Sequence, residues 1–106
     1  MVFPMTVKVY QFWNGKEATI REVKLNEDSV EDNMSKVVTH DQEGVRIGLL
    51  NAVYHYGQNE VQPQNYPSVS VGDIIQLPFD GSFEFWVVAN QGFEFFGREL
   101  RVRPGN

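Results

Sequence analysis

Residues 43–57 read Glu-Gly-Val-Arg-Ile-Gly-Leu-Leu-Asn-Ala-Val-Tyr-His-Tyr-Gly, and this stretch decides the fold class. Its apolar residues recur at the three- and four-residue spacing of one helix face: Val45, Leu49, Val53 and Tyr56, with Leu50 and Tyr54 beside them. Asp41 is a suitable N-cap and Gly57 a suitable C-terminal end. Only a helix that faces a sheet, or lies between two layers, needs so broad an apolar stripe, so the stretch predicts the main helix of an α+β domain.

Ahead of this helix, residues 6–13 (Thr-Val-Lys-Val-Tyr-Gln-Phe-Trp) have the composition of a β-strand. Asn14-Gly15 follows, a strong hairpin signal because both central residues of the turn need positive φ. The apolar pattern then resumes at Ala18, Ile20, Val23 and Leu25. The sequence therefore predicts an N-terminal β-hairpin.

Two interpretations fit residues 26–43. Ser29 could cap a short helix with Val30, Met34, Val37 and Val38 on one face. Four acidic residues would suit the positive end of that helix: Glu27, Asp28, Glu31 and Asp32. The alternative is a polar loop with a short strand at residues 36–39. We favour the short helix.

After the helix, residues 58–70 have the composition of a loop, with two prolines and many amides. A turn leading directly into a strand is expected at 71–77, a hairpin turn at Asp80-Gly81, a partner strand at 83–89, and short strands at 93–96 and 100–102. We thus predict one domain over residues 1–106, of α+β class. Its single small antiparallel sheet, an N-terminal hairpin plus a C-terminal hairpin or meander, packs on one main helix.

Composition narrows the class of partner. The 106 residues carry a net charge of −5, which repels phosphate and anionic lipid, while 42% apolar residues indicate a globular core. The N-terminal residues lack the basic start and apolar run of a signal peptide, and no stretch has the length of a membrane span. We expect a cytoplasmic protein without a membrane partner.

Known catalytic patterns are missing from the sequence. It has no cysteine, and the two histidines, His40 and His55, do not form a His-Glu-x-x-His motif. Neither a Gly-x-Ser-x-Gly elbow nor a phosphate-binding glycine loop occurs. We predict no enzyme, no catalytic residues, no metal site and no cofactor, with His55 in a structural role.

Two sets of residues remain as binding candidates. The first is the aromatic set at 83–96 beside the basic C-terminal end; the alternative is that these rings fill the core. The second is the amide-rich loop, which offers uncharged donors and acceptors; the alternative is ordinary loop composition. The predicted binding residues are Tyr56, Gln58, Asn59, Gln62, Gln64, Trp86, Phe95, Arg98 and Arg101.

Three segments carry a resemblance to known proteins. Residues 9–13, 53–59 and 67–75, above all the run Ser68-Val69-Ser70-Val71-Gly72-Asp73, resemble a group of small proteins encoded by bacteria, phages and conjugative elements. The resemblance implies a cytoplasmic accessory protein of a bacterium or mobile element. That group has no established activity, so it supplies no catalytic residues. The acidic segment and the arginine-bearing tail depart from its pattern.

The functional prediction is a non-catalytic module that binds another protein, in the role of an inhibitor or regulator of a host system. The alternative is a protein that binds single-stranded nucleic acid through Arg98, Arg101, Arg103 and nearby rings.

Overall fold

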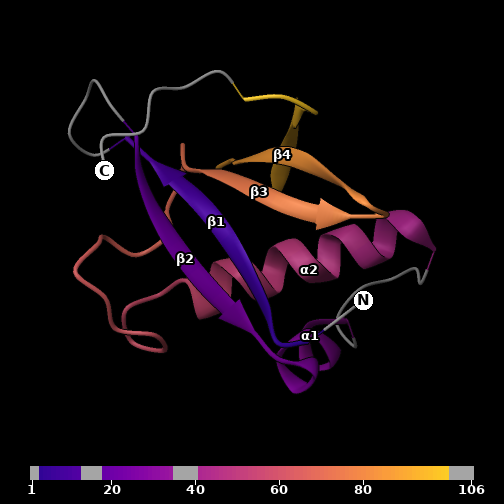
Figure 1. Cartoon of the computed structure of the whole chain (residues 1–106), viewed down its shortest axis with the longest axis horizontal. Coiled ribbons are helices and arrows are strands. Elements are labelled where there is room, and N and C mark those ends of the chain that lie inside the picture. The colour runs from indigo at the N-terminus through magenta and orange to yellow at the C-terminus, as the bar shows by residue number, and fades with distance from the viewer. Residues whose placement is uncertain (1–2, 13–17, 35–40, 101–106) are drawn as a thin grey trace.

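The computed structural model describes residues 3–12, 18–34 and 41–100. Within them, five strands form one antiparallel sheet in the order β2-β1-β3-β4-β5, and two helices link β2 to β3 (Figure 1). The bounds are β1 Met5–Gln11, β2 Thr19–Leu25, α1 Glu27–Met34, α2 Gln42–Tyr56, β3 Ile74–Phe79, β4 Ser82–Val88 and β5 Phe93–Gly97. The predicted α+β class is confirmed, and β1 joins the N-terminal hairpin to the C-terminal meander.

The N-terminal strands pair along their whole length, from Met5 opposite Leu25 to Gln11 opposite Thr19. Alternation places Val7 and Val23 in the core, because successive side chains point to opposite faces of the sheet. The predicted strands are confirmed, while the predicted Asn14-Gly15 turn lies outside the described residues.

The C-terminal strands form the predicted meander. Asp80 and Gly81 connect β3 to β4 with φ of 51° and 80°, the positive values that a two-residue type I′ hairpin requires. The predicted turn leading into a strand at 71–77 is confirmed: residues 70–73 form a turn closed by the Asp73 N–H donating to the Ser70 carbonyl (3.1 Å), and the strand begins at Ile74. Leu100 is not in a strand, so the strand predicted at 100–102 is wrong at its first residue; the other two residues lie outside the described part.

The short helix α1 confirms the favoured interpretation but corrects its cap. Asn26 is the N-cap, since its side-chain oxygen accepts the Ser29 backbone N–H at 2.8 Å, three residues into the helix. Ser29 lies inside the first turn because the helix begins at Glu27. Val37 and Val38 lie outside the described residues.

The main helix α2 has both predicted ends. The Asp41 side chain accepts the Gly44 N–H at 3.0 Å, and the Gly57 N–H donates to the Val53 carbonyl at 2.8 Å. Tyr54 corrects the predicted apolar stripe, because its side chain is 41% exposed on the solvent side of the helix.

The molecule has two layers, with α2 lying across one face of the sheet (Figure 1). It packs against β2, β3 and the short helix α1, and the core lies between these elements. Gly48 permits this arrangement, since a Cβ there would collide with Met34 of α1. In the described part of the chain, neither helix is long and apolar enough to cross a membrane.

Candidate binding surface at the edge of the sheet

One row of side chains runs across all five strands on the face that α2 covers. The strand registers place Arg21, Val9, Ile75, Trp86 and Phe95 side by side in that order. The first three are fully buried, Trp86 is half-buried, and Phe95 is 53% exposed. The part of the sheet that α2 covers therefore ends between β3 and β5, because α2 packs against β2 and β3.

Trp86 and Phe95 form the aromatic end of this row. Their ring centroids are 5.2 Å apart in an edge-to-face arrangement, which is favourable for aromatic pairs. Phe96 follows Phe95 in β5, at a register irregularity between β4 and β5, and it is 52% exposed. We call Trp86, Phe95 and Phe96 the edge patch, because β5 is the last strand of the sheet.

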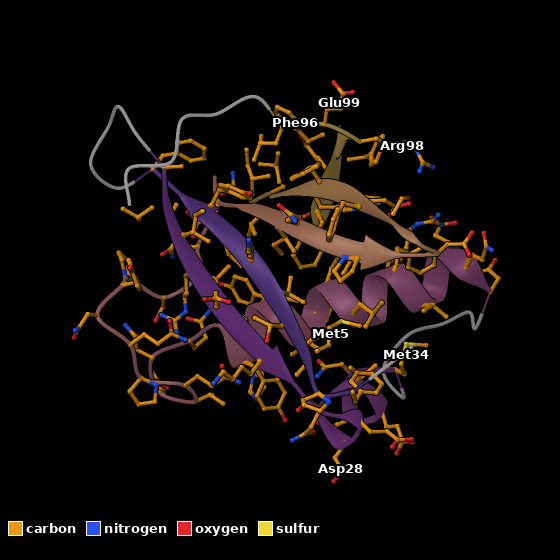
Figure 2. The ribbon with its side chains drawn as sticks, viewed as in Figure 1. Met5, Asp28, Met34, Phe96, Arg98 and Glu99 are labelled. Carbon is orange, nitrogen blue, oxygen red and sulfur yellow. The ribbon has the colours of Figure 1, made fainter. Side chains whose placement is uncertain are left out.

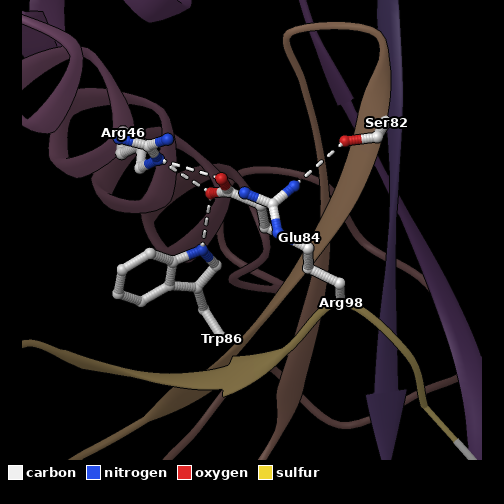
Figure 3. Close-up of polar contacts among 5 residues, drawn as sticks. All are labelled: Arg46, Ser82, Glu84, Trp86 and Arg98. Carbon is white, nitrogen blue, oxygen red and sulfur yellow. Dashed lines mark hydrogen bonds and ion pairs between the residues drawn. The ribbon is translucent and has the colours of Figure 1, made fainter.

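A buried carboxylate fixes the base of the edge patch (Figure 3). Glu84, whose side chain is 4% exposed, accepts the Trp86 indole N–H at 3.1 Å. It also accepts the Nε–H of Arg46 at 2.8 and 3.1 Å, which ties β4 to α2. The Arg46 guanidinium in turn lies 4.3 Å above the Phe79 ring. Glu84 of β4 therefore holds the indole N–H, and Arg46 of α2, stacked on Phe79 of β3, holds the Glu84 carboxylate.

The buried negative charge of Glu84 is paired with the positive charge of Arg46. Burial by itself raises the pKa of Glu84, but the hydrogen bonds from Arg46 and Trp86 and the charges of Arg46 and Arg98 outweigh it, so that pKa is lowered. The hydrogen bond to Glu84, against a smaller effect of burial, raises the pKa of Arg46. Glu84 is thus ionised and fully engaged at neutral pH, which suits a structural anchor better than a general base.

The aromatic set predicted from the sequence is divided between core and surface. Phe85 is buried and touches Tyr10 at a centroid distance of 6.4 Å, and Phe93 packs against the core. Phe83, Phe95 and Phe96 are exposed. Some of these rings therefore fill the core, as the second alternative has it, and binding stays a prediction for the exposed ones.

Arg98 lies next to the edge patch, where Figure 2 shows it at the same end of the molecule as Phe96 and Glu99. Its guanidinium donates to the Ser82 hydroxyl at 3.5 Å. Glu94 and Glu99 are exposed nearby in the chain, so this strand end combines both signs of charge. Arg101, predicted as its companion, lies outside the described residues.

The amide-rich loop lies at the opposite edge of the sheet and is organised by Arg21. The Arg21 guanidinium, 0% exposed, donates to the Asn59 side-chain oxygen and the Gln62 carbonyl, both at 2.6 Å. It also reaches the carbonyls of Tyr66 (3.3 Å) and Pro67 (3.2 Å). Burial lowers the pKa of Arg21, yet an arginine stays charged in proteins. Sequence reasoning missed Arg21, although it occupies an inward position of β2.

The predicted amide residues of this loop are bonded within the molecule. Gln62 donates to the Lys24 carbonyl (2.6 Å) and accepts the Lys24 N–H (3.1 Å), and Gln64 donates to the Glu22 carbonyl (2.7 Å). Gln58 donates to the carbonyls of Tyr54 (2.8 Å) and Val69 (2.9 Å). Tyr56 is half-buried against the core. These bonds account for the predicted amide residues of the loop, of which Gln62 and Gln64 cover the free edge of β2.

The turn at residues 70–73 is also internally satisfied. The buried Asp73 carboxylate accepts the Ser70 N–H at 2.9 Å and the Gln11 amide at 3.2 Å, the turn-capping role expected from the sequence. Burial raises the pKa of Asp73 despite these bonds.

His55 is exposed and stacks edge-on against Tyr56 at 4.9 Å, while His40 lies outside the described part. Within residues 3–12, 18–34 and 41–100, no three metal-binding side chains come together. Comparison with protein-family models, curated proteins and solved structures finds no match to this chain.

Proposed function

We propose that this protein is a non-catalytic module that binds another protein through the edge patch. The observation that carries the proposal is the pair of half-exposed rings, Phe95 and Phe96, on the terminal strand β5. Aromatic side chains held in place by packing are the usual anchors of protein interfaces, because they bury a large apolar area at a small cost in entropy. The Glu84 cluster supplies that preorganisation for Trp86.

The charges around the edge patch support a protein partner over a nucleic acid. Glu94 and Glu99 offset Arg98 near β5, and the whole chain carries a net charge of −5. Phosphate binding needs an excess of cations, which these described residues do not supply. The resemblance of residues 67–75 to proteins of phages and conjugative elements supports a host protein as the partner, with inhibition or regulation as the outcome.

Single-stranded nucleic acid is the second candidate, favoured by one observation. Tyr10, Phe83 and Arg98 line a hollow of about 630 Å³ on the sheet face away from α2. Rings and a guanidinium in one hollow are suited to stacking bases. Arg101 and Arg103 would add charge to such a site.

The test is a pull-down from bacterial lysate with and without nuclease, using wild type and the double variant Phe95→Ser/Phe96→Ser. The matched control is Ile47→Ser, which removes an apolar side chain 41% exposed on α2. We expect a specific protein that survives nuclease, is retained by Ile47→Ser and is lost with the double variant. Thermal unfolding checks that the variants are folded.

Two outcomes contradict the proposal. Retention that disappears with nuclease and weakens steeply with salt establishes the nucleic-acid alternative. A partner held equally by wild type and the double variant places binding elsewhere on the molecule.

A further inference from the structure

A separate apolar groove opens where β1 and β3 part. The two strands pair at residues 8–10 and 74–76. Beyond that register lies a groove of about 610 Å³, lined by Met5 of β1, Val45 of α2, Pro78 and Phe79 of β3, and Phe83 of β4. In Figure 2, Met5 lies well apart from Phe96, so this groove is distinct from the edge patch.

The groove is preformed and accessible. Met5, Val45 and Phe79 are half-buried and packed against the core, which fixes their positions. Phe83 is 50% exposed. A volume of this size lies in the range of about 300–1,000 Å³ that proteins use for ligands. It can therefore receive a bulky apolar group without rearrangement of the core.

The charges at the groove are negative. Asp80 and Gln42 belong to its lining, and Gln42 stands between two exposed acidic residues, Asp41 and Glu43. The nearby cation, Arg46, is engaged by Glu84 at 2.8 Å and so is neutralised locally. Among the described residues at this end of α2, the carboxylates of Glu43 and Asp80 thus set the sign of the potential.

We propose that this groove binds a segment of a partner protein in which a bulky apolar side chain stands next to Lys or Arg. The apolar side chain fills the space between Met5, Val45 and Phe79, and the cation faces Asp80, with Glu43 next to the lining residue Gln42 in the chain. A nucleic acid or an anionic lipid is repelled by the same carboxylates. This second contact is independent of the edge patch.

The test starts from a random peptide library displayed on phage and selected on the immobilised full chain. We expect the enriched sequences to share an aromatic or large aliphatic residue beside Lys or Arg. The consensus peptide, labelled with a fluorophore, is then titrated by anisotropy. Phe83→Ser and the double variant Glu43→Gln/Asp80→Asn should each weaken binding by about fivefold or more, the charge variant mainly through slower association and a smaller salt dependence.

Phe96→Ser is the matched control, since Phe96 is 52% and Phe83 50% exposed. Phe96→Ser should leave peptide binding unchanged. In the charge variant, Asp80→Asn preserves the turn, because Asn tolerates the φ of 51° at this position. The proposal is overturned by a consensus without basic residues, by failure to enrich any sequence, or by equal affinity of Phe83→Ser and wild type. Loss of binding in Phe96→Ser alone assigns the peptide to the edge patch and also overturns it.

Discussion

At the scale of single residues, the described part of the fold buries three charged side chains, Arg21, Asp73 and Glu84, and the first and last have contrasting surroundings. The two terminal nitrogens of Arg21 donate to carbonyl and amide oxygens, whereas its buried Nε has no hydrogen-bond partner among the described residues. Glu84 is paired with a cation and an indole N–H. A buried charge is costly unless its hydrogen bonds are made, so each residue holds its neighbours in one arrangement.

Glu84→Gln should lower the free energy of unfolding by about 1–3 kcal/mol at neutral pH, because Arg46 loses its counter-charge. The pKa of Glu84 is lowered in the fold, so the ionised form contributes stability above the usual glutamate pKa. That contribution is lost as the pH falls through the lowered value. The difference between wild type and variant should therefore shrink in acid, as measured by urea unfolding at a series of pH values.

The pH dependence of wild-type stability alone does not isolate Glu84. The pKa of Asp73 is raised in the fold, so Asp73 makes the protein more stable as the pH falls, which opposes the effect of Glu84. Comparing the two proteins cancels Asp73. A difference between wild type and Glu84→Gln that stays constant from neutral to acid pH would contradict the assignment.

At the scale of elements, the two edges of the sheet are treated differently. The β2 edge is covered by the loop at residues 58–70, whose Gln62 amide pairs with both backbone groups of Lys24. The β5 edge carries the exposed rings of Phe95 and Phe96 instead. Covered edges resist pairing with other chains, so the proposed partner contact at β5 lies on the edge that this loop does not cover.

Gln62→Ala should expose the backbone N–H and carbonyl of Lys24 at the edge of β2. We expect a loss of about 1 kcal/mol in unfolding free energy and faster hydrogen exchange at the Lys24 amide, which loses its acceptor. Gln64→Ala is the control, since the Gln64 side chain donates to the Glu22 carbonyl and, among the described residues, accepts no hydrogen bond from a backbone N–H of β2. Equal exchange at Lys24 in the two variants would show that Gln62 does not protect this edge.

At the scale of the whole molecule, Arg21 joins segments that are far apart in the chain. Its guanidinium in β2 contacts positions 59 to 67, and the row that begins with Arg21 ends at Phe95 on the far edge. The long loop therefore belongs to the cooperative core of the fold, although its composition is that of an exposed connection.

Arg21→Met keeps much of the side-chain volume and removes the donors. We expect a loss of about 2–4 kcal/mol in unfolding free energy, because the Gln62 carbonyl is left without its donor and the Asn59 side-chain oxygen loses its 2.6 Å bond. Arg21→Lys should restore little of the lost stability, since one ammonium group cannot replace the two guanidinium nitrogens that donate to Asn59 and Gln62. Hydrogen exchange should rise across residues 58–70; exchange confined to β2 would contradict the role of Arg21 in holding the loop.

The sequence by itself determined the features that depend on neighbouring residues. The main helix with its Asp41 cap and Gly57 end, the N-terminal strand pair and the Asp80-Gly81 turn follow from local periodicity and turn chemistry. The N-cap of α1 was misassigned because Asn26 and Ser29 are both good caps three residues apart.

Only the tertiary structure decided which aromatic rings are exposed and which polar side chains are buried. Phe85 and Phe95 are alike in the sequence, but the pairing of β1 with β3 and the limited reach of α2 bury one and expose the other. The same pairing places Arg21 beneath the amide-rich loop. Burial depends on contacts between segments distant in the chain, and alternation within a strand fixes only which face a residue occupies.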